Sequence, residues 1–395
     1  MSGERILDTL VVGGGLLGCA VAYYLAREGL DVLLVEKEQL NRQASGQNAG
    51  SLHFQLEYRM IENGVAAAQK AAEALPLHLD AQQRWMALSG ELGADLGIAQ
   101  HGGLMVAEDA AQVAVLERKI ALERSFGLDV TLLDQAELRR RAPYLGPAVV
   151  AAAFCAGEGK ADPRRCALAY AGAAVRHGAA IRSQVGVDEL ALVGRSAGWR
   201  ARLSDGSTVR ARTIVIAAGA WSGRVAQLAG VALPVSPVGL TMTATGRTAP
   251  LVKHLVQHAG RRLSMKQTPE GNILIGGGWP ARLRHLQGIV DLERRPELLL
   301  TSMTANLAAA AEVVPGVAHV PVLRIWTGTT ALVADQLPLL GEVPKTHGVY
   351  IATGGSAFTL GPTYARILAD QILARPSSFN TQAYDPKRFG SLTLA

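Results

Sequence analysis

A glycine-rich turn near the N-terminus carries the strongest chemical signal in the sequence. Residues 13–18 read GGGLLG, a Gly-x-Gly-x-x-Gly pattern that follows the apolar residues 10–12. In such a pattern Gly13 permits a sharp turn, Gly15 lets a pyrophosphate approach the backbone, and Gly18 lets the next helix pack closely on a sheet. The spacing therefore predicts a turn that binds phosphate groups.

The elements around this turn fit a dinucleotide site. Apolar residues recur at helical spacing over residues 16–28, and residues 31–35 form a second apolar run that ends at Glu36. The N–H groups of Leu16 and Leu17 begin the helix, whose positive end would face the phosphates. An acid after the second strand accepts hydrogen bonds from ribose hydroxyls. A tight turn without a ligand is the alternative, but the complete series favours a dinucleotide with a free 2′-hydroxyl.

Length and composition restrict the kind of protein. The chain has 395 residues, of which 49% are hydrophobic, so it can bury a large core divided between two domains. No apolar run reaches the roughly 18 residues that a membrane span needs, so we expect none. Cys19, Cys155 and Cys166 lack metal-ligand spacing, so we expect core thiols of a cytoplasmic protein and no metal. The net charge of +6 is spread along the chain, which favours a solvated surface or subunit interface over nucleic acid binding.

Alternating strands and helices at both ends of the chain enclose regions of different character. Residues 61–144 are mainly helical, and residues 236–320 contain strand-like runs followed by a helix. The sequence predicts an α/β fold: a Rossmann-like dinucleotide-binding domain with an inserted α+β substrate domain, which has an antiparallel sheet and helices. The expected ranges are 1–60, 145–235 and 321–395 for the first domain, and 61–144 and 236–320 for the substrate-binding or interface domain.

Three further stretches suit contact with a planar ligand. Residues 43–53 are small, polar and glycine-rich, residues 213–222 read as a buried strand that ends in a small-residue turn, and residues 354–362 form a glycine-rich turn before a helix. With the first turn, and in this order, they resemble the D-amino-acid oxidase-like family of flavoproteins, which includes glycine oxidase, sarcosine oxidase and L-2-hydroxyglutarate dehydrogenase. The resemblance covers nearly the whole chain. It implies an extended FAD with its adenosine end at residues 13–18.

The resemblance also implies which residues contact FAD. The adenine would meet the backbone of Val185, with Val187 as the other candidate, and the isoalloxazine ring would lie between residues 43–53 and 354–359. A helix that begins at Pro362 would present positive potential to the pyrimidine edge of the ring, where negative charge appears on reduction. The expected contacts are Gly13, Gly15, Leu16, Leu17, Gly18, Glu36, Lys37, Ala44, Ser45, Gly46, Asn48, Ala49, Gly50, Ser51, Leu52, Val185, Ala218, Gly219, Trp221, Gly328, Asp335, Gly354, Gly355, Ser356, Ala357, Phe358 and Thr359.

Within this family the chain is similar to the β subunits of heteromeric amine dehydrogenases. Residues 265–278, which read MKQTPEGNILIGGG, and residues 323–328, which read LRIWTG, carry this likeness. Such subunits occur in heterotetrameric sarcosine oxidase, hydroxyproline dehydrogenase and opine oxidase, and an opine oxidase or dehydrogenase is the narrower expectation. The likeness implies an α subunit, in some cases a small iron–sulfur subunit, and FMN at the subunit contact. Arg165 stands where a histidine attaches FMN in sarcosine oxidase β subunits, so any FMN would be non-covalent.

Two positions depart from the family pattern. Many members carry an arginine that holds the substrate carboxylate after the Trp-x-Gly motif, whereas this chain has Thr330 there. The expected catalytic set is therefore Thr330 itself with His53, Lys266 and Arg324 as substitutes for that arginine. Structural roles are the alternative for each: ion pairing of Arg324, a solvated strand end for Lys266, and packing of His53 under the ring. Monomeric sarcosine oxidases carry a lysine where this chain has Thr359, so we expect a dehydrogenase that serves a partner.

The expected chemistry is hydride transfer from the α-carbon of an amino acid or N-substituted amino acid to flavin N5, followed by imine hydrolysis. Positioning and loss of the amine proton supply most of the effect, and His53 would assist because imidazole titrates near pH ~6.5. One alternative is a 2-hydroxy-acid dehydrogenase with His53 as the base, because residues 48–53 resemble a loop of L-2-hydroxyglutarate dehydrogenase. Another is a flavin-bearing scaffold or tRNA-modification subunit, which salt-dependent RNA binding would support.

Overall fold

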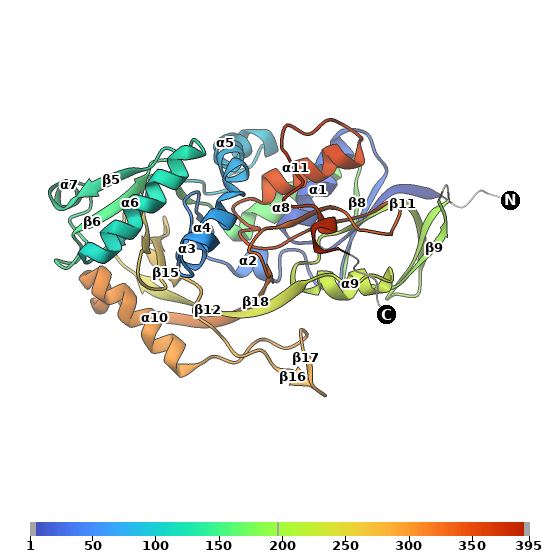
Figure 1. The fold of residues 1–395 in the computed structure, drawn as a ribbon. Coiled ribbons are helices and arrows are strands. Elements are labelled where there is room, and N and C mark those ends of the chain that lie inside the picture. The colour runs from blue at the N-terminus through green and yellow to red at the C-terminus, as the bar shows by residue number, and fades with distance from the viewer. Residues whose placement is uncertain (1–4, 196, 391–395) are drawn as a thin grey trace.

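The structure is a computed structural model that describes residues 5–195 and 197–390. Two sheets of eight strands each organise the described residues (Figure 1). The first sheet lies toward the right of the view and includes β1 and β11, and the second lies toward the left and includes β5, β6 and β15. This arrangement confirms the predicted α/β class, with a dinucleotide-type sheet and a second, largely antiparallel sheet.

The first sheet is mainly parallel and carries the glycine turn. Its parallel strands have the order β20-β11-β1-β2-β8, while β19 pairs antiparallel with β20, and β10 joins β9 to β11 in antiparallel pairings. The strands are β1 Ile6–Val12, β2 Val32–Glu36, β8 Ala180–Ser183, β9 Val187–Gly194, β10 Gly198–Leu203, β11 Thr208–Ile216, β19 Leu339–Glu342 and β20 Val349–Thr353. Runs of Val, Leu and Ile suit β1 and β2 because both faces of a central parallel strand are buried.

Three helices pack together on the first sheet. Helix α1, Leu16–Arg27, is buried at each residue from 16 to 26 and contacts α8, Pro163–Arg176, and α11, Gly361–Ile372. Asp162 before Pro163 is a sequence pattern that predicts a helix start, and the Asp162 side chain caps α8 by accepting a hydrogen bond from the Arg164 N–H. This packing fixes the N-terminus of α1 at the end of β1, where the glycine turn lies.

The second sheet has the order β18-β12-β15-β14-β13-β4-β6-β5, in which the β13–β4 pair is parallel. One of its faces packs into an apolar core that includes Leu104, Val256, Met265 and Ile275. Its strands are β4 Gly103–Ala107, β5 Thr131–Asp134, β6 Ala151–Cys155, β12 Val235–Arg247, β13 Leu255–His258, β14 Ser264–Gln267, β15 Asn272–Gly276 and β18 Val322–Val333. Alternate residues of β14 therefore divide between this core and the space between the two sheets.

The remaining elements are helices, short 3₁₀ turns and two strand pairs. The helices are α2 Ala44–Gln47, α3 Tyr58–Ile61, α4 Val65–Ala72, α5 Leu75–Leu92, α6 Ala110–Ser125, α7 Gln135–Arg141, α9 Ser222–Leu228 and α10 Leu300–Val313, with short 3₁₀ turns η1 Gly219–Trp221, η2 Pro315–His319 and η3 Pro386–Phe389. Two strand pairs complete the set: β3 Ser51–Leu52 with β7 Gly159–Lys160, and β16 His285–Leu286 with β17 Ile289–Val290. Within the described ranges, no helix is both long and apolar enough to span a membrane.

Some elements differ from the sequence expectation. The sequence pattern predicts one strand over residues 180–187, but this run is broken, because Gln184 has a φ of 60° between β8 and β9. Strands β6 and β18 belong to the second sheet, although the predicted ranges 145–235 and 321–395 place them with the first. Their partners, β4 and β12, are distant in sequence, and apolar alternation reveals a strand without revealing its neighbour. The domain limits themselves stay a prediction.

Candidate active site

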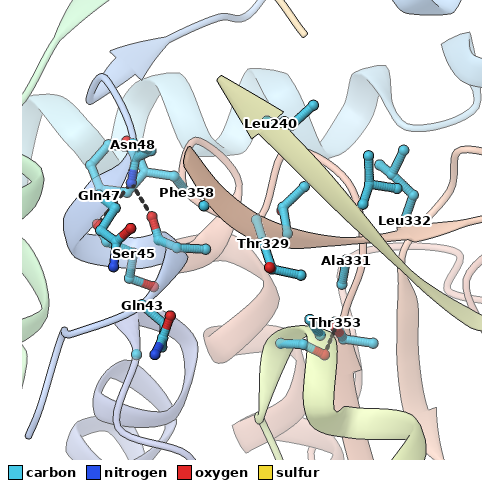
Figure 2. A pocket seen from close by; sticks show the side chains of 18 of the residues that line it. Gln43, Ser45, Gln47, Asn48, Leu240, Thr329, Ala331, Leu332, Thr353 and Phe358 are labelled. Carbon is cyan, nitrogen blue, oxygen red and sulfur yellow. Dashed lines mark hydrogen bonds between the residues drawn. The ribbon is translucent and has the colours of Figure 1, made fainter. Parts of the chain in front are cut away.

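A cavity of about 930 Å³ lies between the two sheets. Its wall at one end includes Gly13, Glu36 and Trp221, and we call this the turn end. Its wall at the other end includes His53 and Arg262, and we call this the His53 end. Figure 2 shows part of the cavity, where Ser45, Gln47 and Asn48 lie opposite Thr329, Ala331 and Thr353. The cavity thus joins the glycine turn to the C-terminal turn.

The backbone of the glycine turn is closely packed at the turn end. Gly13 has a φ of 115°, and a Cβ there would lie 2.5 Å from the Ala217 carbonyl oxygen. A Cβ on Gly18 would overlap the Gly13 carbonyl oxygen. The Glu36 carboxylate accepts a 2.6 Å hydrogen bond from the Gly14 N–H, so this acid also braces the turn. These contacts require glycine and leave the backbone open to a close ligand.

The stretch predicted as a loop at 43–53 contains the short helix α2. Asn48 holds it, because its Nδ2 donates to the carbonyl oxygens of Ala44 and Ser45 at 3.0 and 2.7 Å. The Leu16 N–H donates to Ser45 Oγ at 2.9 Å, which ties α2 to the first turn of α1. Trp326 Nε1 donates to the Gln47 carbonyl at 3.0 Å and ties α2 to the second sheet. This stretch is therefore clamped between both sheets.

Most of the predicted residues come together in the cavity wall. They are Gly13, Gly15, Leu17, Glu36, Lys37, Ala44, Ser45, Asn48, Ala49, Ser51, His53, Ala218, Gly219, Trp221, Gly328, Thr330, Gly354, Gly355, Ser356, Ala357, Phe358 and Thr359. Five others, Leu16, Gly18, Gly46, Gly50 and Leu52, lie behind that wall and shape its turns.

Three predicted residues point elsewhere. Asp335 forms an ion pair with Arg388 at 2.8 Å and so anchors the C-terminal segment instead of lining the cavity. The Val185 N–H donates to the Glu36 carbonyl at 2.9 Å, whereas Val187 lies in the cavity wall. Arg324 is exposed, and its guanidinium stacks on Trp326 at 4.7 Å outside the cavity. Motif spacing places these residues in the chain but does not fix the direction of their side chains.

Lys266 lies behind the cavity wall rather than in it. Its side chain is buried beside Gly50 and has no carboxylate within ion-pair distance among the described residues. Burial, with the neighbouring Lys160 charge, holds the pKa of Lys266 well below its usual value. The expectation of a solvated strand end is therefore wrong, and a substrate contact by Lys266 would require passage through the wall at Gly50.

His53 is the central polar group of its end of the cavity. Its Nε2 hydrogen-bonds with Ser264 Oγ at 2.9 Å, while its Nδ1 has no partner among the described residues. Burial lowers the pKa of His53 to about 4, so the imidazole is neutral at physiological pH. A neutral ring with one free nitrogen can donate or accept a single hydrogen bond to a ligand.

A second polar cluster links the segment after His53 to the C-terminal turn. Arg59 donates to Ser356 Oγ at 2.8 Å, to Gln336 Oε1 at 2.5 Å and to Glu57 Oε1 at 3.1 Å. Burial raises the pKa of Glu57, but the charge of Arg59, the neighbouring His53 and the hydrogen bonds from Ser356 and Arg59 together outweigh burial and lower the pKa to about 2. The Glu57–Arg59 pair is therefore fully charged and internally balanced. No motif marks these residues in the sequence, so sequence reasoning missed them.

Buried carboxylates accept the backbone hydrogen bonds of residues 53–57, the segment that carries His53 and Glu57. Glu158 accepts hydrogen bonds from the N–H groups of Phe54 and Gln55, both at 2.8 Å. Glu123 accepts one from the Leu56 N–H at 2.6 Å and pairs with the buried Lys119 at 2.8 Å. Burial raises the pKa of Glu158 to about 7. Side chains thus take the place of a neighbouring strand along this segment.

A projecting segment, residues 279–299, crosses to the turn end, and we call it the arm. Its β16–β17 pair extends away from the body in Figure 1. Glu293 of the arm pairs with Lys37 at 2.6 Å and accepts a 3.0 Å hydrogen bond from Trp221 Nε1, and Arg224 approaches it to 3.6 Å. Lys37 also stacks over Trp221 at 4.2 Å. All four side chains line the cavity, so the arm closes the turn end.

Fold and cavity together define a class of protein. A Gly-x-Gly-x-x-Gly turn on a parallel sheet, a cavity, and an antiparallel sheet that covers its far end are the features of a dinucleotide-dependent oxidoreductase. The chain belongs to the family described as FAD dependent oxidoreductase, which matches residues 8–371. It is therefore a flavoenzyme.

Similar proteins span nearly the whole chain. An opine oxidase subunit of Rhizobium meliloti is 28% identical, over 97% of this chain and 98% of its own length. Glycine oxidase of Geobacillus kaustophilus is 26% identical, over 96% and 97%. The crystal structure of the Geobacillus kaustophilus glycine oxidase superposes with a TM-score of 0.83, at 25% identity over 98% of this chain and 99% of that one.

The residues present fit FAD. The tight backbone at Gly13 and Gly15 leaves no room for side chains where a pyrophosphate would lie, since a Cβ at Gly15 would lie 2.9 Å from Ser45 Oγ. The cavity then continues to Ser356 and Phe358 in the turn before α11, whose N-terminus carries partial positive charge. An extended dinucleotide is the shape that reaches both turns.

Proposed function

We propose that this protein uses FAD to oxidise the α-carbon–nitrogen bond of an amino acid or an N-substituted, opine-like amino acid. One observation carries the proposal: the glycine turn and the His53 end, whose imidazole stays neutral, line the same cavity. The activities named for the similar proteins, opine oxidase and glycine oxidase, support the same bond.

The chain's own groups would bind and orient the substrate. When bound, FAD supplies the hydride acceptor. The neutral His53 ring adds no positive charge beside the substrate, so it favours the free amine, whose nitrogen lone pair promotes loss of the α-hydride. The turn at residues 354–359 and the N-terminus of α11 supply positive potential for charge that develops at the C-terminal side of the cavity.

The same imidazole weighs against the 2-hydroxy-acid alternative. Removing a hydroxyl proton needs a base whose pKa lies near the working pH, and burial lowers the pKa of His53 to about 4. Such a ring is a weak base. The low pKa of His53 therefore favours an amine donor, which loses its proton to water before it binds.

The proposal extends to a partner. The likeness to an opine oxidase subunit supports a second polypeptide that accepts the electrons. Thr359 in the C-terminal turn supports a dehydrogenase over an oxidase, as expected from the missing lysine. A small iron–sulfur subunit, a non-covalent FMN at the subunit contact and a cytoplasmic location stay predictions that the proposed reaction does not require.

Anaerobic reduction of the bound flavin tests the proposal. The purified FAD-loaded protein would be mixed with opines, with N-methyl and D-amino acids, and with the matching 2-hydroxy acids. The absorption of the flavin band, at roughly 450 nm, would then be followed. We expect bleaching by one of the amines and none by the hydroxy acids. Bleaching by hydroxy acids alone would overturn the amine assignment, and oxygen uptake at the rate of dye reduction would overturn the dehydrogenase.

A further inference from the structure

The His53 end lacks the carboxylate-binding arginine of the family pattern, so the cations that line the cavity need to be compared. Thr330 occupies the position of that arginine and lines the cavity. Among the described residues, the Lys and Arg side chains of the cavity wall are Lys37, Arg42, Arg59, Arg224 and Arg262.

Three of these cations are paired with carboxylates, and a fourth, Arg42, lies beside the glycine turn. Lys37 and Arg224 hold Glu293 at the turn end. Arg42 follows Asn41, whose N–H donates to the Gly14 carbonyl at 2.9 Å, so it also belongs to the turn end. The charge of Arg59 is balanced by Glu57 at 3.1 Å. None of the four offers an uncompensated charge at the His53 end.

Arg262 differs from the others in its partners. Its nearest carboxylate, Glu62, lies at the 4.0 Å limit of an ion pair, and its remaining contact is a 3.3 Å hydrogen bond to the Gly278 carbonyl. It precedes by two residues Ser264, which holds His53. Its guanidinium is therefore a loosely paired cation of the cavity wall, two residues from the serine that contacts His53.

Gln257 supplies an independent observation at the same place. It lies on β13 directly opposite Ser264 of β14, it lines the cavity, and only 2% of it is exposed. Its Nε2 has no hydrogen-bond partner among the described residues. A buried amide donor without an acceptor is costly. Nε2 itself is closed off from the empty cavity, so the Gln257 amide would turn toward an acceptor that a ligand supplies there.

We propose that Arg262 and Gln257 form a subsite that binds a carboxylate of the substrate and replaces the arginine missing at Thr330. Arg262 provides the charge and the fork of donors, and the Gln257 amide provides a neutral donor from the sheet. Glu62 holds the guanidinium loosely, so a substrate carboxylate can displace it. This inference rests on the proposed function, because the carboxylate belongs to an amino-acid-derived substrate.

The test measures carboxylate binding to the FAD-loaded enzyme without turnover. Isothermal titration with propionate and with propionamide compares a charged ligand with its neutral analogue. Arg262→Gln should weaken propionate binding about 10- to 100-fold and leave propionamide unchanged, as expected for loss of a charged hydrogen bond. Gln257→Leu should weaken the binding of both ligands, by a smaller factor than Arg262→Gln weakens propionate binding. Gln257→Glu should abolish the binding of propionate and keep the binding of propionamide.

Arg261→Gln is the matched control. It removes the same charge one residue away, where the guanidinium pairs with Glu108 and Glu312 outside the cavity. The control should bind propionate as the unaltered enzyme does, and all variants should keep their FAD affinity. Equal propionate binding by Arg262→Gln and the unaltered enzyme would overturn the subsite. An equal loss in Arg261→Gln, or no preference for propionate over propionamide in the unaltered enzyme, would also overturn it.

Two outcomes separate this inference from the proposed function. If Arg262-dependent propionate binding is found but no amine bleaches the flavin, the subsite stands and the proposed reaction fails. If an amine bleaches the flavin with the same KM in Arg262→Gln and in the unaltered enzyme, the reaction stands and the subsite fails. A raised KM with a nearly unchanged kcat supports both.

Discussion

The two ends of the cavity are built in different ways. At the turn end, a backbone donor and a charge that line the cavity already have partners: Glu36 holds the Gly14 N–H, and Glu293 holds Lys37. At the His53 end, the His53 Nδ1 and the Gln257 Nε2 have none among the described residues, and Arg262 is loosely held. The first end is shaped before a ligand arrives, whereas the second presents polar groups that a substrate can satisfy. The preformed end suits retention of a common cofactor, and the end with unsatisfied polar groups suits selection of a particular substrate.

Substitution of Gly18 should have the largest effect. Gly18→Ala places a Cβ against the Gly13 carbonyl oxygen, so α1 must move and the phosphate turn opens. We expect FAD affinity to fall by about 100-fold or more, given that even 1.4 kcal/mol is worth tenfold. The FAD content of the purified protein and a Kd from fluorescence titration measure it.

Gly172→Ala is the control for this prediction. Gly172 lies within α8, where a Cβ would meet only the Arg176 side chain at 3.6 Å. This change should leave FAD binding intact and stabilise the helix by about 0.5–1 kcal/mol. Normal FAD binding by Gly18→Ala would show that the turn end is less tightly preformed than its contacts indicate.

The pH dependence of stability should report the His53 end. The folded-state pKa of His53 is about 4 and the ordinary value is 6.5, so between these pH values the unfolded chain binds more protons. The contribution of neutral His53 to the free energy of unfolding should therefore be complete above pH 6.5 and should be lost as the pH drops toward 4. For one group the change is up to about 3 kcal/mol.

Denaturant unfolding of the unaltered protein and His53→Gln over this range provides the measurement. His78, His254 and His258 have pKa values lowered by burial to about 4 as well, so the variant should flatten the curve in part. Curves of equal slope would mean that the pKa of His53 is the same in the folded and unfolded chain, so burial would not keep its imidazole neutral below pH 6.5.

Release of FAD should test closure of the turn end by the arm. Glu293→Gln removes the charge that Lys37 and Arg224 share, so the arm should open more often. We expect FAD dissociation to accelerate about 5- to 10-fold and to lose part of its salt dependence. Glu297→Gln, which alters an arm residue paired with Arg284 outside the cavity, should have little effect. Equal rates for both variants would remove the arm from cofactor retention.

Asp335→Asn should have the smallest effect on the site. The Asp335–Arg388 ion pair fastens η3 to the segment before β19, so its loss should cost about 1 kcal/mol of stability. FAD affinity should stay unchanged, because Asp335 is not in the cavity wall. A tenfold loss of FAD affinity would restore the sequence-based expectation of a cofactor contact.

The same contrast explains what the sequence could predict. The turn end is encoded within about 30 consecutive residues, whose glycines and Glu36 have fixed spacing. The His53 end is assembled from strands and loops that are distant in sequence. They meet through the register of β13 on β14 and through the hydrogen bonds that hold residues 53–57 to buried carboxylates. No local pattern marks Arg59, Gln257 or Arg262. Conversely, Arg324 matches a motif but stacks on Trp326 at the surface, because spacing does not set side-chain direction.

The hydrogen bonds between residues 53–57 and buried carboxylates affect how substrate preference can change. A strand paired to a neighbour can shift only by whole residues, and a shift by one turns every side chain to the opposite face. Here the backbone N–H groups end on the buried side-chain carboxylates of Glu158 and Glu123, which no strand register constrains. Small adjustments of those two side chains can translate the imidazole by fractions of an ångström, so new specificities can be tuned gradually while the nucleotide sheet keeps its alignment.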